Sequence, residues 1–162
     1  MNQEFNINEF AKMKGLDPLW MKRLSFTSIM ISSNLLQTMF SKTLGELTSK
    51  QWLLLTISSS LPENPTLSEL GKYMGCSRQN VKQIAEILSK KGYVEFTKNE
   101  GDKNTVRVSP TEKWFLYAQE NDAYTSTILE EIFNGFREEE LKQYFMSFRK
   151  LMDNIERINE RL

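Results

Sequence analysis

The 162-residue sequence contains no histidine. Histidine is the usual general base, the usual partner of a serine or cysteine nucleophile and a common zinc ligand. A carboxylate-based enzyme would need two acidic side chains that converge in a cleft, and no spacing in the sequence predicts such a pair. We therefore expect no enzyme, no catalytic residue, no metal site and no cofactor.

Cysteine, proline and long apolar runs are also scarce. The single cysteine, Cys76, excludes an intramolecular disulfide. No apolar run approaches the roughly 20 residues that a membrane-spanning helix needs, and residues 1–15 lack the apolar core of a signal peptide. These absences predict a cytoplasmic protein with no membrane partner. The four prolines and seven glycines fall between periodic segments, which predicts a mainly helical chain.

Charge is balanced in total but unevenly distributed along the chain. The sequence has 21 basic and 21 acidic side chains. Residues 66–108 carry eight basic and five acidic groups, a net charge of +3, whereas residues 109–162 carry seven and eleven, a net charge of −4. A positive segment inside a neutral protein is a modest indication of an anionic partner.

Most of the expected helices begin with a capping signal. A capping side chain is followed either by proline or by Glu or Gln three residues later at Asp17-Pro18, Thr48–Gln51, Thr66–Glu69 and Ser109–Glu112. A further helix begins at Ser77 and is closed by Gly92. After it, residues 93–98 and 105–109 favour strands joined by a polar turn, which predicts a β-hairpin.

Residues 67–88 have the spacing of a helix-turn-helix motif. Gly71 lets the second helix approach closely, Gly75 supplies the left-handed backbone of a sharp turn, and Val81 anchors the second helix. A hairpin with basic residues directly after this second helix makes the motif a winged helix.

The second helix opens with side chains suited to nucleic acid. Ser77 caps it and, with the first backbone N–H groups, would suit a phosphate. Arginine can bind guanine, and asparagine or glutamine can bind adenine, in the major groove. The candidate recognition residues are Ser77, Arg78, Gln79, Asn80, Lys82 and Gln83. The alternative is a solvated helix face with a good cap.

The segments LTSKQWLLL, TLSELGKYMGCSRQNVKQIAEILSKKGYVEF and GDKNTVRVSPTEK resemble the MarR family of bacterial transcriptional regulators. The resemblance covers roughly residues 20–160. It implies a dimer that presents two winged helices to duplex DNA, with dimerisation through residues 1–46 and 110–162 and DNA binding through residues 47–109.

The resemblance also implies which residues of the wing contact DNA. Family wings commonly read Asp-Arg-Arg, whereas this chain has Asp102-Lys103-Asn104, so the minor-groove arginine is replaced by Lys103 or shifted to Arg107. The expected wing residues are Lys98, Lys103, Asn104 and Arg107.

The last helix carries one apolar stripe at helical spacing. Its members are Leu141, Tyr144, Phe145, Phe148, Leu151, Met152, Ile155 and Ile158. The stripe predicts a partner helix in a symmetric dimer, while packing on the first long helix of the same chain is the alternative.

Two further features have a functional and a structural interpretation. Cys76 is either a redox sensor at a helix start or an apolar residue that packs under the turn, and we favour packing. Trp20, Trp52, Trp114, Tyr117 and the methionines of the first long helix either line a pocket for a small aromatic effector or belong to the core, and we favour the core.

The sequence thus predicts a homodimeric winged-helix transcriptional regulator. It would bind a pseudo-palindromic operator as a repressor, with release by a small-molecule effector as an added feature. The alternative is a winged-helix module for protein–protein interaction that has no role on DNA.

Overall fold

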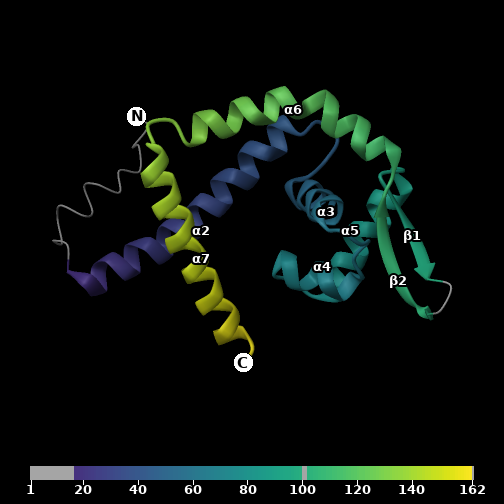
Figure 1. Ribbon diagram of the computed structural model, residues 1–162, viewed down its shortest axis with the longest axis horizontal. Coiled ribbons are helices and arrows are strands. Elements are labelled where there is room, and N and C mark those ends of the chain that lie inside the picture. The colour runs from purple at the N-terminus through teal and green to yellow at the C-terminus, as the bar shows by residue number, and fades with distance from the viewer. Residues whose placement is uncertain (1–16, 100–101, 162) are drawn as a thin grey trace. The chain divides into compact units, whose positions relative to one another are not determined.

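The computed structural model describes residues 17–99 and 102–161. The chain divides into two compact units, Met1–Phe115 and Leu116–Leu162, and each is described by itself. The described elements are α2 (Pro18–Thr43), α3 (Ser49–Ser60), α4 (Leu67–Met74), α5 (Arg78–Lys90), β1 (Val94–Asn99), β2 (Asp102–Pro110), α6 (Glu112–Ile132) and α7 (Glu138–Asn159) (Figure 1). None of these helices combines the length and the apolar character that a membrane span requires.

The predicted capping signals of the first three helices are confirmed. The carboxylate of Asp17 accepts a hydrogen bond from the Trp20 N–H at 3.3 Å, with Pro18 in the first helical position of α2. Thr48 with Gln51, and Thr66 with Glu69, form complete capping boxes at the starts of α3 and α4. Each box satisfies two backbone donors that the helix itself leaves unpaired.

The core of the first unit lies between α3, α4, α5 and the hairpin, which Figure 1 shows gathered together. Each of these elements contributes at least one side chain that is 2% exposed or less. The buried set is Leu54, Leu55, Leu70, Val81, Ala85, Leu88, Tyr93, Val94 and Val108. Outside this core, Phe40 of α2 stacks on Trp52 of α3 with ring centroids 5.3 Å apart.

The hairpin is an antiparallel pair to which a third segment is attached. Val94 pairs with Pro110 and Thr97 with Arg107, and the register shifts between Lys98 and Asn99. The connection between α3 and α4 lies along the other side of β2, because the Val108 N–H donates to the Pro65 carbonyl at 2.9 Å. β2 therefore has hydrogen-bonding neighbours on both sides near its C-terminal end.

The predicted start of α6 at Ser109 is wrong. Ser109 pairs with Glu95 in the hairpin, β2 continues to Pro110, and the helix begins at Glu112. The Thr111 N–H donates to the Tyr93 carbonyl at 3.0 Å, and the Thr111 hydroxyl donates to the Gly92 carbonyl at 2.6 Å. Strand pairing thus outweighs the local capping signal, and the chain turns into the helix two residues later.

The second unit contains most of α6, a turn and α7. Gly135, with φ of +86°, makes the turn, and Glu140 accepts from the Arg137 N–H at 2.9 Å at the start of α7. Four aromatic rings pack around the turn, with centroids 5.8 to 6.3 Å apart: Phe133, Phe136, Tyr144 and Phe148. This cluster fixes the direction in which α7 leaves the turn.

Candidate nucleic-acid interface

The turn between α4 and α5 depends on two glycines, as the sequence predicts. A Cβ atom on Gly71 would lie 2.8 Å from the Cys76 carbonyl oxygen, which is closer than real Cβ contacts come. Gly75 has φ of +62°, in the left-handed region that other residues enter only at a cost. Gly71 therefore permits the close approach, and Gly75 permits the reversal that brings α5 across α4.

The start of α5 is an ordinary N-cap on an amphipathic helix. The Ser77 hydroxyl accepts a hydrogen bond from the Asn80 N–H at 3.2 Å. Val81, Ile84, Ala85 and Leu88 bury one face of the helix. Because this face is held in the core, the opposite face cannot be used for packing within the unit.

That opposite face carries most of the candidate recognition residues. Ser77, Arg78, Gln79, Lys82 and Gln83 are exposed, whereas Asn80 is half-buried. The one acidic side chain of α5, Glu86, lies 3.6 Å from the ammonium group of Lys82. The structure thus places five of the six predicted side chains outward along about two turns of one helix.

The end of α5 is joined tightly to β1. The Tyr93 N–H donates to the Leu88 carbonyl and the Gly92 N–H to the Ser89 carbonyl, both at 2.9 Å. This is the Schellman arrangement, and Gly92 has the positive φ of +78° that it requires. The hairpin therefore starts in a fixed direction from the end of α5.

A polar cluster around Glu46 was not predicted from the sequence. The Glu46 carboxylate accepts a hydrogen bond from the Tyr93 hydroxyl and lies 3.5 Å from the Lys113 ammonium group. Lys113 also donates to the Lys91 carbonyl at 2.9 Å and lies 4.3 Å from the centroid of the Tyr93 ring. The Tyr93 hydrogen bond, with help from Lys113, holds the pKa of Glu46 below its usual value. No local sequence signal connects positions 46, 93 and 113.

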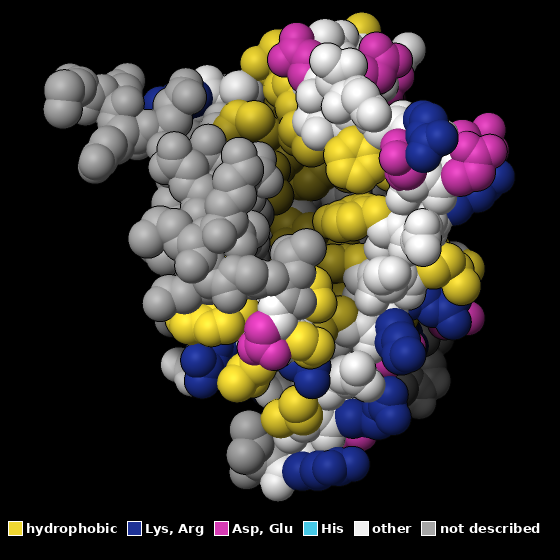
Figure 2. Space-filling view, turned by 90° about the vertical axis from the view of Figure 1, so that its left-hand side faces the viewer, with side chains coloured by type: hydrophobic (Ala, Val, Ile, Leu, Met, Phe, Trp, Pro, Cys, Tyr) yellow, Lys and Arg dark blue, Asp and Glu magenta, His cyan; other side chains and the backbone are white. Residues whose placement is uncertain are grey.

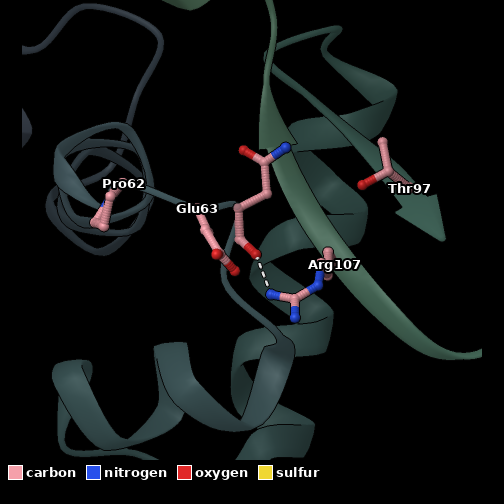
Figure 3. Close-up of a pocket in the computed structure, with 5 residues that line it drawn as sticks. Pro62, Glu63, Thr97 and Arg107 are labelled. Carbon is pink, nitrogen blue, oxygen red and sulfur yellow. Dashed lines mark hydrogen bonds between the residues drawn. The ribbon is translucent and has the colours of Figure 1, made fainter. Parts of the chain in front are cut away.

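The wing residues fall into different environments. Lys98 on β1 is exposed. Lys103 and Asn104 lie in β2, but their side chains are outside the part of the chain that the structure describes. Arg107 is half-buried at the base of the hairpin, where its Nη1 donates to the Asn64 carbonyl at 2.6 Å (Figure 3).

The same arginine lines an open pocket at the base of the wing. Its other lining residues are Pro62, Glu63, Asn64 and Thr97, and its volume is about 410 Å³ (Figure 3). None of the four aromatic residues considered for an effector pocket lines it. Trp114 is 4% exposed and Trp52 stacks on Phe40, so the core interpretation fits these two.

Cys76 is half-buried in the turn. Its backbone takes part in the motif, since its N–H donates to the Gly71 carbonyl at 2.9 Å. The expectation of a packed core residue therefore holds only in part.

The apolar stripe on α7 is exposed along its whole length. Its eight side chains retain between 36% and 61% of their accessible surface, and the helix has no buried residue. Figure 2 shows that many hydrophobic side chains, drawn in yellow, lie at the surface of the face that it presents. A monomer rarely leaves so many large apolar side chains in water, and such surfaces mark sites of association.

Comparison with known proteins agrees with this geometry. Residues 47–106, which contain α3, α4, α5, β1 and the first five residues of β2, match the model of the MarR family. The predicted resemblance and the mainly helical, winged-helix fold are both confirmed.

Solved structures share the fold beyond residues 47–106. A MarR/EmrR family transcriptional regulator from Acinetobacter sp. ADP1 is 19% identical, with a TM-score of 0.74 over 85% of this chain and 98% of the other. The transcriptional regulator BldR from Sulfolobus solfataricus is 15% identical, with a TM-score of 0.75 over 86% and 99%. The organohalide-sensing regulator RdhR-CbdbA1625, in its 2,4-dichlorophenol-bound form, is 16% identical, with a TM-score of 0.70 over 87% and 86%. The chain therefore has the fold of MarR-family transcriptional regulators.

Proposed function

We propose that this protein is a homodimeric, sequence-specific DNA-binding regulator, with α5 as its recognition helix. The observation that carries the proposal is the two-sided character of α5. One face is buried by Val81, Ala85 and Leu88, and the other presents Arg78 and Gln79 to solvent. A helix fits the major groove of B-DNA, where guanidinium and amide groups can distinguish base edges.

Contacts to the DNA backbone would come from the helix start and from the wing. Ser77 and the first N–H groups of α5 suit a phosphate oxygen. Lys82, Gln83, Lys98, Lys103 and Asn104 complete the proposed contact set. The exposure of Arg78 and Lys98 is what such an interface needs, because a cation held in internal contacts could not replace the counterions of DNA.

We propose that residues 110–162, together with residues 1–46, form the dimer and that residues 47–109 bind DNA. The exposed stripe on α7 supports a symmetric interface, because a second copy would present the same stripe. A two-fold dimer reads two related half-sites, about 10 base pairs apart from centre to centre. The operator would therefore be pseudo-palindromic. The dimer would repress by covering a promoter.

Release by a small aromatic effector is the second part of the proposal. Its support is the neighbouring regulator described as organohalide-sensing and bound to 2,4-dichlorophenol. The probe is therefore 2,4-dichlorophenol itself, titrated into a preformed complex of the protein with DNA. If the dissociation constant of the protein–DNA complex stays unchanged up to millimolar 2,4-dichlorophenol, this part of the proposal is contradicted, whereas the proposal of DNA binding is unaffected.

The deciding experiment is selection of bound fragments from a random duplex pool. We expect enrichment of a two-fold symmetric site. The logarithm of the affinity for this site should fall linearly with the logarithm of the salt concentration, with a slope of about −0.9 for each phosphate contacted. Recovery of no enriched sequence, together with salt-insensitive binding, would contradict the proposal. The protein–protein interaction module would then be the better explanation of the fold.

A further inference from the structure

Arg107 lies far from the tip of the wing. It is paired with Thr97 across the hairpin, five residues along β2 from Asp102, where the strand begins. At about 3.3 Å per residue, this distance is roughly 16 Å. Arg107 is also half-buried, unlike the exposed Lys98 on the neighbouring strand.

The guanidinium group of Arg107 already has a partner within the fold. Its Nη1 donates to the backbone carbonyl of Asn64 at 2.6 Å, across 43 positions of the chain (Figure 3). A charged donor makes a stronger hydrogen bond to a carbonyl than a neutral one does. This bond therefore attaches the wing to the connection between α3 and α4.

The backbone beside Arg107 makes the same connection. Arg107 forms an isolated bridge with Thr66, and the next residue, Val108, donates its N–H to the Pro65 carbonyl at 2.9 Å. Thr66 is also the N-cap of α4, the first helix of the helix-turn-helix motif. The side-chain bond and the backbone bonds thus hold one edge of the wing against the start of that motif.

The charges around Arg107 do not favour a DNA phosphate. Glu63 lines the same pocket. Hydrogen bonds from Thr66 lower the pKa of the Glu69 carboxyl group, and the positive charge of Arg107 nearby lowers it further. Two carboxylates near the guanidinium would repel a phosphate that approached it. An arginine would bind a DNA phosphate more favourably if no carboxylate lay beside it.

We propose that Arg107 is a positioning residue, which holds the wing against the α3–α4 connection and makes no contact with DNA phosphate. The part that concerns DNA rests on the proposed function. The anchoring itself can be measured on the protein without DNA. This assignment separates Arg107 from Lys98, although both are basic residues of the same hairpin.

The test compares Arg107→Met with Lys98→Met in the full-length protein. Each substitution removes one positive charge and keeps an unbranched side chain. Hydrogen exchange without DNA reports the anchor through the amide of Val108, since exchange measures local opening. The amide of Tyr93, bonded to Leu88 at the end of α5, is the reference for global stability. Binding to duplex DNA is then titrated at several salt concentrations.

We expect Arg107→Met to speed exchange at Val108 by about tenfold or more relative to Tyr93, which is the effect of losing one hydrogen bond from a charged donor. Its affinity for DNA should fall by the same factor at every salt concentration, so that the salt slope stays as in the wild type. Lys98→Met should leave exchange at Val108 unchanged. It should make the slope of log affinity against log salt concentration less steep by about 0.9.

Unchanged exchange at Val108 in Arg107→Met would overturn the proposal, and so would a loss of about 0.9 in its salt slope. If the wild-type protein binds no DNA, the proposed function fails. The exchange at Val108 then still decides whether Arg107 anchors the wing. General unfolding of the variant would appear as equal acceleration at Val108 and Tyr93, which would also overturn a local anchoring role.

Discussion

The hydroxyl of Tyr93 donates a hydrogen bond to the carboxylate of Glu46, although 47 positions separate the two residues in the chain. Glu46 lies in the connection between α2 and α3, and Tyr93 follows the end of α5. Lys91 strengthens the same junction by donating from its ammonium group to the Glu46 carbonyl. The end of the proposed recognition helix is therefore held to the segment that precedes the winged domain.

The Glu46 cluster should make stability depend on pH in the acidic range. Its folded-state pKa lies below the ordinary value of 4.5, so its contribution is fully present above pH 4.5 and is lost as pH falls through the folded value. The free energies of unfolding of Glu46→Gln and of the wild type, measured with urea, should therefore differ most at neutral pH and become more similar as the pH falls towards about 3.

The matched control for this cluster is Tyr93→Phe, which removes the hydroxyl and keeps the buried ring. Glu46→Gln should cost less stability in the Tyr93→Phe background than in the wild type, since the two residues share one interaction. A stability difference that is the same at pH 3 and pH 7 would contradict the role of the Glu46 charge.

Gly71→Ala should destabilise the winged domain. The added Cβ would meet the Cys76 carbonyl oxygen at 2.8 Å, and a backbone atom cannot move aside as a flexible side chain can. Overpacking of this kind costs about 1–3 kcal/mol, partly offset by the better helix propensity of alanine. We expect a net loss of about 1–2 kcal/mol in the free energy of unfolding, measured with urea.

Ser68→Ala is the control for that substitution, because Ser68 is exposed on the same short helix. Its unfolding free energy should stay within about 0.5 kcal/mol of the wild type. A Gly71→Ala variant as stable as Ser68→Ala would show that the turn can open without cost.

Arg78→Ala and Gln79→Ala should each weaken binding to the selected site by about 1–3 kcal/mol, and weaken binding to random duplex much less. Both side chains are exposed on the first turn of α5, where the proposed function places the base edges. Asn80→Ala should have a smaller effect, because Asn80 is half-buried. The measurement is a pair of fluorescence anisotropy titrations for each variant, on the selected and on the random duplex.

Lys90→Ala provides the control at the other end of the same helix, where the side chain is exposed in the last turn. It should leave the ratio of the two affinities unchanged. If Arg78 and Gln79 can both be replaced without changing that ratio, α5 does not read bases.

Phe145→Asp should dissociate the proposed dimer. Phe145 lies on the α7 stripe and is 61% exposed in the single chain. Burial of a phenylalanine contributes about 1.5–3 kcal/mol, and a symmetric interface contains the residue twice. We therefore expect the dimer dissociation constant to rise by at least about 100-fold in sedimentation experiments.

Met146→Asp is the matched control, since Met146 is 60% exposed and lies beside the stripe rather than on it. Its dissociation constant should stay within a few-fold of the wild type. Equal dimer stability in the Phe145 and Met146 variants would exclude the stripe as the interface.

The local features of this protein could be predicted from its sequence. The capping boxes at Thr48 and Thr66 and the left-handed turn at Gly75 each depend on residues within about four positions. The two-sided pattern of α5 likewise follows from helical periodicity, so the sequence by itself determined the winged helix and its exposed polar face.

Only the tertiary structure decided how these elements are joined. Ser109 carries a valid capping signal, but its backbone pairs with Glu95 in the hairpin. The sequence alone predicts Arg107 to be one more DNA-contacting residue of the wing, but its guanidinium group donates a hydrogen bond to the Asn64 carbonyl. The first contact joins positions 14 residues apart and the second joins positions 43 residues apart. Both form only where packing of the core brings two segments together. A pattern of neighbouring residues does not specify such a contact. Periodicity determines which side of an element faces inward, but it does not determine which distant segment that side will contact.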